Sequence, residues 1–300
     1  MKILSLLIVF IMLFTQGCAT QSPSQDSGKI EVVATLFPQY DFVREIGGEL
    51  VSVQLILPAG TESHHFDPTP ADMVKISESD LFIYTGDLME GWAGDIASSL
   101  PENVFILNAS ENIELAASHD DGHNHALDPH IWLNFENAIK MCENIKNALI
   151  ALSPENTDFF NSNFEQYKES LIKLDDEYSS VFAQTPSKSL VFGGRFALGY
   201  LVDKYSIPHK SAYESCSAND EPSVQVILEL SEYVKNNDIS VVYCEEFSDP
   251  KVAREIAKAN NAEVLVLHSA HNTSSEEREN NVSFLSLMYQ NLENIRKGLL

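Results

Sequence analysis

The chain has 300 residues, of which 44% are apolar, and it carries a formal net charge of −25 at pH 7. This length is enough for one large domain or two ordinary domains, each with its own core. The strong negative charge argues against binding to nucleic acid or to anionic lipid, and it favours cations at long range.

The N-terminus predicts an export signal over residues 1–17. Lys2 supplies a positive start, and residues 3–14 form an apolar run that only Ser5 interrupts. This run is shorter than the roughly 20 residues that a transmembrane helix needs. Removal of the signal would make the net charge more negative, because Lys2 is its only charged side chain.

Cys18 follows this segment and resembles the cysteine at which bacterial lipoproteins are cleaved and lipidated. Thr15 and Gln16 depart from the residues usual at such a site, so an ordinary signal peptide and a released protein are the alternative. Residues 18–28 are rich in Gln and Ser. They would form a flexible tether between the lipid and the folded chain.

The first half of the chain alternates short apolar runs with segments of helical spacing. Val, Ile, Leu and Phe dominate the runs, which is typical of buried strands. The predicted strands are residues 30–36, 51–57, 81–84 and 104–107, and the predicted helices are residues 39–46, 69–78 and 92–100. This alternation predicts a parallel sheet with helices on its faces.

The middle of the chain predicts one long helix over residues 154–183. Ser153 and Pro154 suit a helix cap and a first turn. Apolar residues then recur at steps of three or four, namely Phe160, Phe164, Tyr167, Leu171, Leu174, Tyr178 and Val181. Such a helix is roughly 45 Å long, so we expect it to lie along both halves of the molecule. A long helix inside a single domain is the alternative.

The second half restarts the alternation. Its predicted strands are residues 190–192, 240–244 and 264–267, and its predicted helices are residues 196–205, 223–236, 250–260 and 282–297. We therefore predict an α/β fold: two α/β domains with parallel-type sheets, bridged by one long backbone helix. The expected divisions are an N-terminal lobe over residues 29–152, the connecting helix over 153–185 and a C-terminal lobe over 186–300.

Three cysteines remain after Cys18. Cys142 shares one apolar helix face with Ile145 and Leu149, which favours a small core residue. Cys216 and Cys244 could form a disulfide or remain thiols near a metal site, and the sequence leaves both possibilities open.

Residues 118–132, SHDDGHNHALDPHIW, concentrate four of the nine histidines of the chain among aspartates. Imidazole suits borderline metals such as zinc, and aspartate adds oxygen ligands. We predict an auxiliary metal-collecting loop with His119, His123 and His125 that leads into a fixed ligand at His130. A solvated acidic loop is the alternative.

Metal-type residues also follow the predicted strands, at the edge where ligands bind in open α/β sheets. His64 and His130 lie beyond two strands of the first half, and His268 follows the last strand directly. The neighbouring His65 is the alternative to His64. The pair Glu245 and Glu246 follows another strand of the second half. A single residue of this kind more often has a structural role than a metal-binding one. The prediction of a metal site in the cleft between the lobes therefore rests on their shared position at strand ends.

Two histidine motifs make the prediction more specific, namely residues 57–68, LPAGTESHHFDP, and residues 128–132, DPHIW. Together they resemble the metal-binding cluster of bacterial ABC-transporter solute-binding proteins for zinc and manganese, the ZnuA/TroA-like (cluster A-I) family. The similarity extends over nearly the whole mature chain. The resemblance implies that His64 and His130 are metal ligands.

The resemblance also identifies two departures from the family. Arg195 stands where the family has a third ligand, His or Glu, and a guanidinium stays protonated and cannot coordinate a metal. We expect Arg195 to pair with Glu245 or Glu246 beside the site. His268 stands where the family usually has Asp as its fourth ligand.

We therefore expect a rebuilt site in which His64, His130 and His268 bind the metal. A carboxylate or a water molecule would be the fourth ligand. Glu246, or else Glu245, is the leading candidate, because three neutral imidazoles leave the charge of a divalent cation largely uncompensated. The weaker candidates for that position are Glu214, Cys216 and His271. Nitrogen-rich coordination favours Zn²⁺, whereas Mn²⁺ prefers oxygen ligands and is the alternative.

The resemblance implies a receptor outside the cytoplasm and no enzymatic activity. It would be a monomer, anchored to the membrane through lipid on Cys18, and would deliver metal to an ABC permease and its ATPase. A manganese or iron receptor of the same type is one alternative. A zinc hydrolase is disfavoured because the sequence lacks an H-E-x-x-H motif, and a surface adhesin with a role in cell adhesion is the third alternative.

Overall fold

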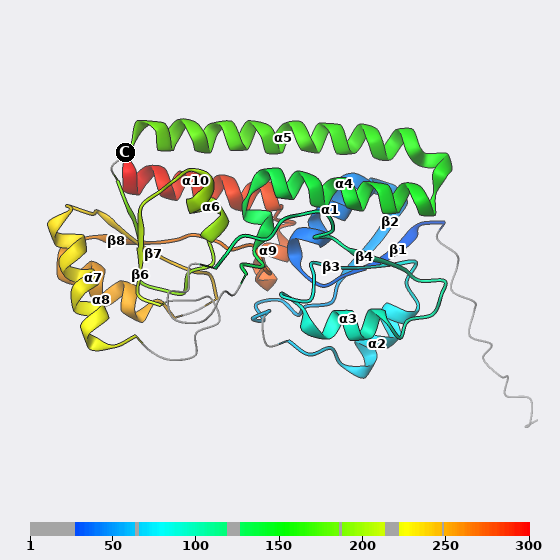
Figure 1. Ribbon diagram of the computed structural model, residues 1–300, viewed down its shortest axis with the longest axis horizontal. Coiled ribbons are helices and arrows are strands. Elements are labelled where there is room, and N and C mark those ends of the chain that lie inside the picture. Colours follow the sequence, from blue (N-terminus) through cyan, green and yellow to red (C-terminus); the bar gives the residue numbers. More distant parts are fainter. Residues whose placement is uncertain (1–27, 64–65, 119–126, 186–187, 214–221, 248) are drawn as a thin grey trace, which may run out of the picture.

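Two four-stranded parallel sheets form the framework of the protein, one from each half of the chain (Figure 1). The computed structural model describes residues 28–63, 66–118, 127–185, 188–213, 222–247 and 249–300. The predicted class, two α/β domains with parallel sheets and a long helix between them, is confirmed. The lobe boundaries at residues 152 and 186 stay predictions.

The N-terminal sheet has the strand order β2-β1-β3-β4. Its strands are β1 (Ile30–Ala34), β2 (Val51–Leu55), β3 (Leu81–Tyr84) and β4 (Phe105–Asn108). The helices of this lobe are α1 (Phe37–Gly47), α2 (Pro70–Ser77), α3 (Gly91–Ala97) and α4 (Phe135–Leu152), with 3₁₀ turns η1 (Gly48–Leu50) and η2 (Ile131–Leu133). Strand β3 is buried along its whole length, which explains its unbroken apolar sequence.

The C-terminal sheet repeats this topology in the order β6-β5-β7-β8. Its strands are β5 (Leu190–Phe192), β6 (His209–Ser211), β7 (Val241–Cys244) and β8 (Glu263–Val266). The helices are α6 (Gly199–Lys204), α7 (Val224–Asn236), α8 (Lys251–Asn260), α9 (Ser275–Glu279) and α10 (Phe284–Leu299). Because the strands of each sheet are parallel, their carboxyl ends lie at one edge, where the loops with the candidate ligands begin.

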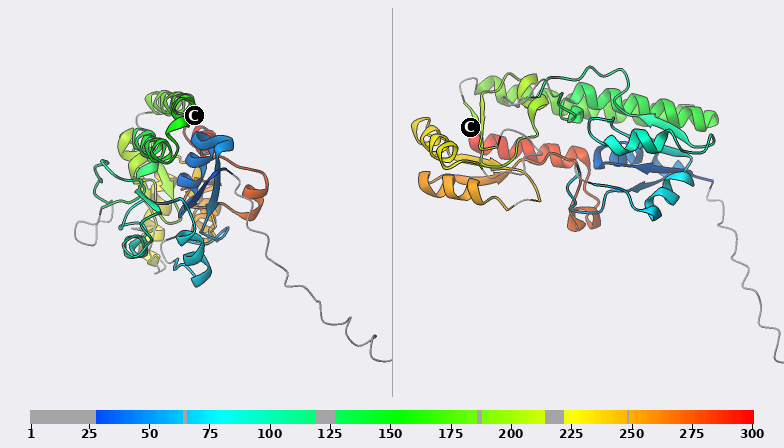
Figure 2. Two further views of the ribbon diagram at one scale, coloured as in Figure 1. Left: turned by 90° about the vertical axis from the view of Figure 1, so that its right-hand side faces the viewer. Right: turned by 60° about the horizontal axis from the view of Figure 1, so that its bottom comes forward.

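The long helix α5 (Thr157–Gln184) runs along both lobes (Figures 1 and 2). Every residue of its predicted apolar stripe is buried, and it packs on α1 and α4 of the first lobe and on α10 of the second. The hydroxyl of Tyr178 donates to the carbonyl of Met288 in α10 at 2.7 Å. The helix begins later than predicted because Pro154–Asn156 form a separate 3₁₀ turn, η3.

One apolar core continues from lobe to lobe beneath α5. Its buried members include Phe42 and Trp132 from the N-terminal lobe and Tyr243 and Met288 from the C-terminal lobe. A smaller apolar cluster covers the other face of each sheet. Separating the lobes would expose this shared core to water, at a cost of about 25 cal/mol per Å² of apolar surface.

Three elements differ from the sequence-based expectation. Strand β6 was not predicted, because its sequence His-Lys-Ser has no apolar pattern and its place at the sheet edge rests on backbone pairing with β5. Helix α9 was not predicted either, because its sequence SEERE has no apolar residue. Helix α6 begins at Gly199, three residues later than expected.

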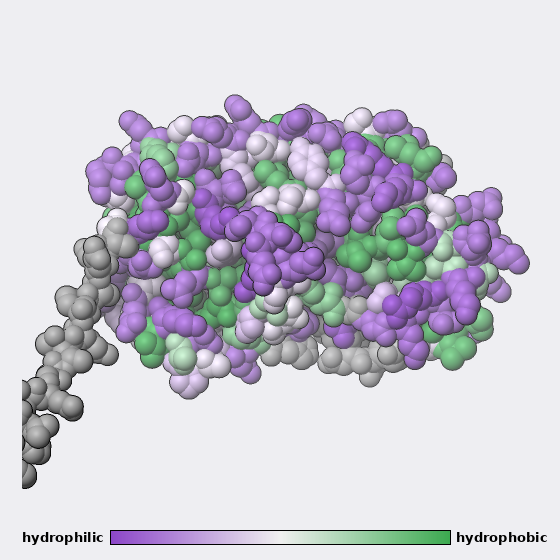
Figure 3. Space-filling view, turned by 180° about the vertical axis from the view of Figure 1, so that it is seen from behind, coloured by the Kyte–Doolittle hydropathy of each residue, from purple (hydrophilic) through white to green (hydrophobic). Residues whose placement is uncertain are grey.

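Hydrophilic residues cover most of the face seen from behind, with small apolar areas among them (Figure 3). This surface is consistent with the large excess of acidic over basic residues. Within the described part of the chain, no helix has both the length and the apolar character needed to cross a bilayer.

The cysteines that the structure describes, Cys142 and Cys244, are buried free thiols. Burial raises the pKa of Cys142 well above its usual value and raises that of Cys244 to about 11. Neither thiol therefore ionises readily at neutral pH. Cys216, the other residue of the possible disulfide, lies outside the described residues.

Asp41 of α1 is a buried carboxyl group at the junction with α10. Its Oδ2 accepts a hydrogen bond from the backbone N–H of Phe284, the first residue of α10, at 2.7 Å. Arg44 lies 3.5 Å from its Oδ1. Burial disfavours the charged form and raises the pKa of Asp41 to about 7, although the bond from Phe284 opposes this rise.

This pKa predicts that Asp41 makes folding depend on pH. The folded state holds the proton more tightly than the unfolded chain, in which the pKa of Asp is about 3.9. The free energy of unfolding should therefore fall by up to about 4 kcal/mol as the pH rises from about 4 to about 7. Asp41→Asn keeps the acceptor for Phe284, so it should match the wild type at about pH 4 and be more stable at about pH 8.

Denaturant titrations across this pH range measure the difference. Asp95→Asn, on the exposed side of α3, is the matched control and should follow the wild type throughout. If Asp41→Asn and the wild type had the same pH profile, Asp41 would not be the group responsible.

Candidate metal centre

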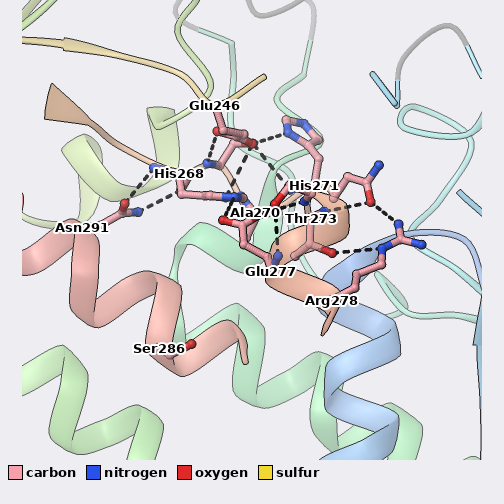
Figure 4. A network of polar contacts seen from close by, with 12 residues as sticks. Glu246, His268, Ala270, His271, Thr273, Glu277, Arg278, Ser286 and Asn291 are labelled. Atoms are coloured by element: carbon pink, nitrogen blue, oxygen red, sulfur yellow. Dashed lines mark hydrogen bonds and ion pairs between the residues drawn. The ribbon is translucent and has the colours of Figure 1, made fainter. Parts of the chain in front are cut away.

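The loop after β8 carries two histidines at the carboxyl edge of the C-terminal sheet (Figure 4). Asn291 of α10 fixes the backbone of His268, because its Oδ1 accepts from the His268 N–H at 2.7 Å and its Nδ2 donates to the His268 carbonyl at 2.8 Å. Ala270 has a left-handed backbone with a φ of 62°. The chain thus turns sharply between His268 and His271.

The side chain of His268 is engaged by neighbouring protein groups. Its Nδ1 accepts a hydrogen bond from the Ala270 N–H at 2.9 Å and lies 3.6 Å from Glu246 Oε1, and its Nε2 lies 3.6 Å from Glu277 Oε1. Burial opposes protonation, but the two carboxylates raise the pKa of His268. When the ring is neutral, its acceptor nitrogen is Nδ1, and this atom already accepts the hydrogen bond from Ala270. When the ring is protonated, both nitrogens carry a hydrogen and neither can accept.

The ion pair also affects Glu277. The hydrogen bond from His268 lowers the pKa of Glu277 to about 2. Ser274 contributes as well, because its backbone N–H donates to Glu277 at 2.7 Å and its hydroxyl at 2.8 Å. His268 is therefore joined to the first turn of α9.

His271 lies against His130 of the other lobe. The ring centroids are 4.6 Å apart and the ring planes are at 86°. Trp132 contacts both rings, at 5.6 Å from His130 and 5.4 Å from His271. Its Nε1–H donates to the carbonyl of Ser269 at 2.8 Å. The fold thus brings two imidazoles from opposite lobes into contact.

His130 is buried just before η2 and is oriented by Asp128. Asp128 Oδ1 accepts from the backbone N–H of His130 at 2.9 Å and lies 2.5 Å from its Nδ1. A carboxylate accepts and does not donate, so Nδ1 carries the proton and Nε2 is the basic nitrogen. Histidines that bind metals usually donate their other N–H in this way.

The two glutamates after β7 have different partners. Glu246 accepts a hydrogen bond from the backbone N–H of Ser269 at 2.9 Å and another from its hydroxyl. Glu245 accepts from the backbone N–H of Arg195 at 2.9 Å. The Glu245 carboxylate fills the space that a Cβ at Gly194 would occupy, so a larger residue there would displace this carboxylate.

Several predicted site residues lie outside the described part of the chain. They are His64, the loop histidines His119, His123 and His125, the lipidation residue Cys18, and the weaker candidates Glu214 and Cys216. Among the described residues, no group of three or more His, Cys, Asp or Glu side chains has the geometry of a metal site. The described part of the candidate centre is therefore the pair of His130 and His271.

Sequence reasoning placed His271 below His268 as a candidate ligand. The only sequence signal in favour of His271 was its place in the loop after the last strand, which His268 shares. The predictions that His268 and Glu246 bind metal directly stay predictions. So does the expected pairing of the Arg195 charge with Glu245 or Glu246.

The same loop continues into a clasp on the N-terminal lobe (Figure 4). The clasp joins Asn272, Thr273 and Arg278 to the backbone of residues 57–61. Asn272 Nδ2 donates to the carbonyls of Pro58 at 2.7 Å and Thr61 at 2.9 Å, and Arg278 Nη2 donates to the carbonyl of Leu57 at 2.7 Å. This backbone is the start of the first histidine motif and precedes His64 in the sequence.

Comparison with known families identifies this chain. The model of the family described as zinc-uptake complex component A, periplasmic (ZnuA) matches residues 32–298. The chain belongs to the ZnuA family. A relative in this family, the high-affinity zinc uptake system protein ZnuA of Bacillus subtilis, is 30% identical over 304 residues, which cover 97% of this chain and 95% of that protein.

Streptococcal relatives are similar in sequence and in structure. The zinc-binding lipoprotein AdcA of Streptococcus pneumoniae is 31% identical over 309 residues, which cover 99% of this chain but 61% of AdcA. This chain thus spans less than two thirds of the length of that relative. The crystal structure of the Zn(II)-bound ZnuA-like domain of the same AdcA has a TM-score of 0.78 and 30% identity, with 91% of this chain and 99% of that domain covered.

The clasp generates a prediction for stability. Asn272→Ala removes the hydrogen bonds that Nδ2 donates to the carbonyls of Pro58 and Thr61 and those that Oδ1 accepts from Thr273 and Arg278. The free energy of unfolding should therefore fall by about 1–3 kcal/mol. Asn237→Ala is the matched control, because it removes one exposed bond to Tyr233 and should change stability by at most about 0.5 kcal/mol. Urea titrations compare the two variants, and equal stabilities would mean that the Asn272 side chain contributes nothing to the clasp.

Proposed function

We propose that this protein is a receptor outside the cytoplasm that binds Zn²⁺ in the cleft between its lobes and delivers it to an ABC importer. The observation that carries the proposal is the contact between His130 and His271 at the carboxyl edges of the two sheets. Imidazole nitrogen is a preferred ligand of zinc. Membership of the ZnuA family and the zinc-binding names of the Bacillus and Streptococcus relatives support the same cargo.

The proposed zinc ligands are His130, His271 and His64. The clasp supports the inclusion of His64, because it ties the backbone that precedes this residue to Asn272, the residue after His271. Three imidazoles leave a fourth position of a tetrahedral zinc ion for a water molecule or a carboxylate.

For His268 and Glu246 we propose positions beside the metal instead of direct coordination. His268 bonds to Ala270 and pairs with Glu277, and these contacts support a role in shaping the loop. Glu246 bonds to Ser269 and supplies negative charge near the cation. Glu245 and Arg195 would lie behind this carboxylate.

Zinc is favoured over manganese because nitrogen dominates the proposed ligands, whereas manganese prefers oxygen. In this proposal Zn²⁺ is cargo, and no reaction is assigned to the protein. A hydrolase would need a general base beside an open metal position. The carboxylates nearest the histidine pair, Asp128 and Glu246, instead hold His130 and Ser269.

Delivery would involve an ABC permease and its ATPase as partners of a monomeric receptor. We propose that residues 1–17 are removed, that Cys18 carries lipid and that residues 18–28 form the tether to the membrane. The periplasmic description of the family and the lipoprotein name of the pneumococcal relative support this location.

A series of single variants tests the ligand set by calorimetry of metal-stripped protein with Zn²⁺ and Mn²⁺. His64→Ala, His130→Ala and His271→Ala should each weaken zinc binding by at least about 100-fold, or about 2.7 kcal/mol. His268→Ala should weaken it by less than about tenfold. His209→Ala, whose ring stacks on Phe196 in the C-terminal lobe, is the matched control and should bind like the wild type.

The results separate the alternatives. If neither metal bound tightly to the wild type, the proposed function would be wrong. If His268→Ala lost binding while His271→Ala kept it, the ligand would be His268, as the sequence suggested.

The auxiliary loop has a separate test. Replacing His119, His123 and His125 together by alanine should slow zinc capture at limiting metal, because extra imidazoles raise the local concentration of cation near the site. The dissociation constant of the main site should not change. Stopped-flow association rates and calorimetry measure the two effects, and loss of tight binding in the triple variant would place the main site in the loop.

A further inference from the structure

We infer that Ser269 and Glu246 form a hydrogen-bonded relay that holds the proton of His271 on Nδ1 and so directs its basic Nε2 to the metal. Ser269 and Glu246 are thus positioning residues, since they act through His271. The inference rests on the proposed function in one respect, namely that His271 is a zinc ligand.

The hydrogen bonds of the Ser269 hydroxyl determine the direction of the relay. A hydroxyl has one proton and two lone pairs. The Glu246 carboxylate can only accept, so the proton of Ser269 points to Glu246 Oε1. The backbone N–H of His271 donates to Ser269 Oγ at 3.4 Å, and His271 Nδ1 faces the same oxygen. With its proton already used, the hydroxyl can only accept from Nδ1, which must therefore carry a hydrogen.

The relay is held in place from both lobes. Glu246 Oε2 accepts from the backbone N–H of Ser269 at 2.9 Å, so the carboxylate binds the serine through two bonds. Trp132 of the N-terminal lobe donates to the Ser269 carbonyl at 2.8 Å. Ser269 is 4% exposed, so water competes little for its hydroxyl. The geometry leaves the serine little freedom to turn toward another partner.

The relay also explains how two neighbouring histidines come to have the same tautomer. His130 donates from Nδ1 directly to Asp128, whereas His271 donates from Nδ1 through Ser269 to Glu246. Both rings then present Nε2 as the basic nitrogen. A neutral histidine in water prefers the opposite tautomer, with the proton on Nε2, so a fixed acceptor at Nδ1 is needed to present Nε2 to a metal.

The test measures the tautomer of His271 in metal-free protein and its zinc affinity in parallel. Two-dimensional ¹H–¹⁵N spectra of labelled full-length protein above about pH 8, where ordinary imidazoles are neutral, identify which nitrogen carries the proton. Loss of one signal set in His271→Ala assigns the ring. The relay variants are Ser269→Ala and Glu246→Ala, and Ser79→Ala, which changes another buried serine far from the loop in sequence, is the control.

In the wild type the proton of His271 should be on Nδ1. Ser269→Ala removes its acceptor, and Glu246→Ala lets the serine hydroxyl turn and donate to Nδ1, so both variants should move the proton toward Nε2. Zinc affinity should fall by about 10- to 100-fold in both, and Ser79→Ala should change neither property. Because the spectra are recorded without metal, they test the relay even in a variant that binds zinc poorly.

A wild-type proton on Nε2, or an unchanged tautomer in Ser269→Ala, would overturn the relay. The role of Glu246 would be overturned if only the serine variant moved the proton. Failure of the proposed function gives a different result: the tautomers would shift as expected while His271→Ala bound zinc as tightly as the wild type.

Discussion

Hydrogen bonds from one loop to both lobes hold the candidate metal centre together. On the C-terminal side, Asn291 and Glu246 bind the loop after β8. On the N-terminal side, Trp132 donates to the Ser269 carbonyl of the loop, and Asn272 of the loop donates to the carbonyls of Pro58 and Thr61. His271 lies between these two sets of bonds, so its position depends on both lobes although it belongs to the C-terminal half of the sequence. These bonds hold His271 in contact with His130, which is distant in the sequence.

Two acidic side chains orient the imidazole rings of His130 and His271. Asp128 acts on His130 directly, and Glu246 reaches His271 through Ser269. Carboxylates placed behind histidines make the rings better metal ligands and offset part of the charge of the bound cation. In the proposed site they would do so without occupying the metal position themselves.

The shared core gives this arrangement a fixed frame. Helix α5 packs on α1, α4 and α10, and the apolar interior beneath it continues from one lobe to the other. The distance between the two sheets is therefore set by close packing, and the contact between His130 and His271 does not depend on a large rotation of one lobe against the other. Movement that accompanies binding or release is expected in the loops at the sheet edges.

The α/β class and the long helix were predictable from the sequence alone, because both depend on local periodicity. The sequence also predicts a metal ligand at His130 from spacing within a few residues. It missed β6, whose pairing rests on backbone groups. It favoured His268 over His271, although both follow the same strand. Only the tertiary structure distinguishes them: the Ala270 N–H and the carboxylates of Glu246 and Glu277 lie around the ring of His268. Contacts with the opposite lobe place His271 beside His130.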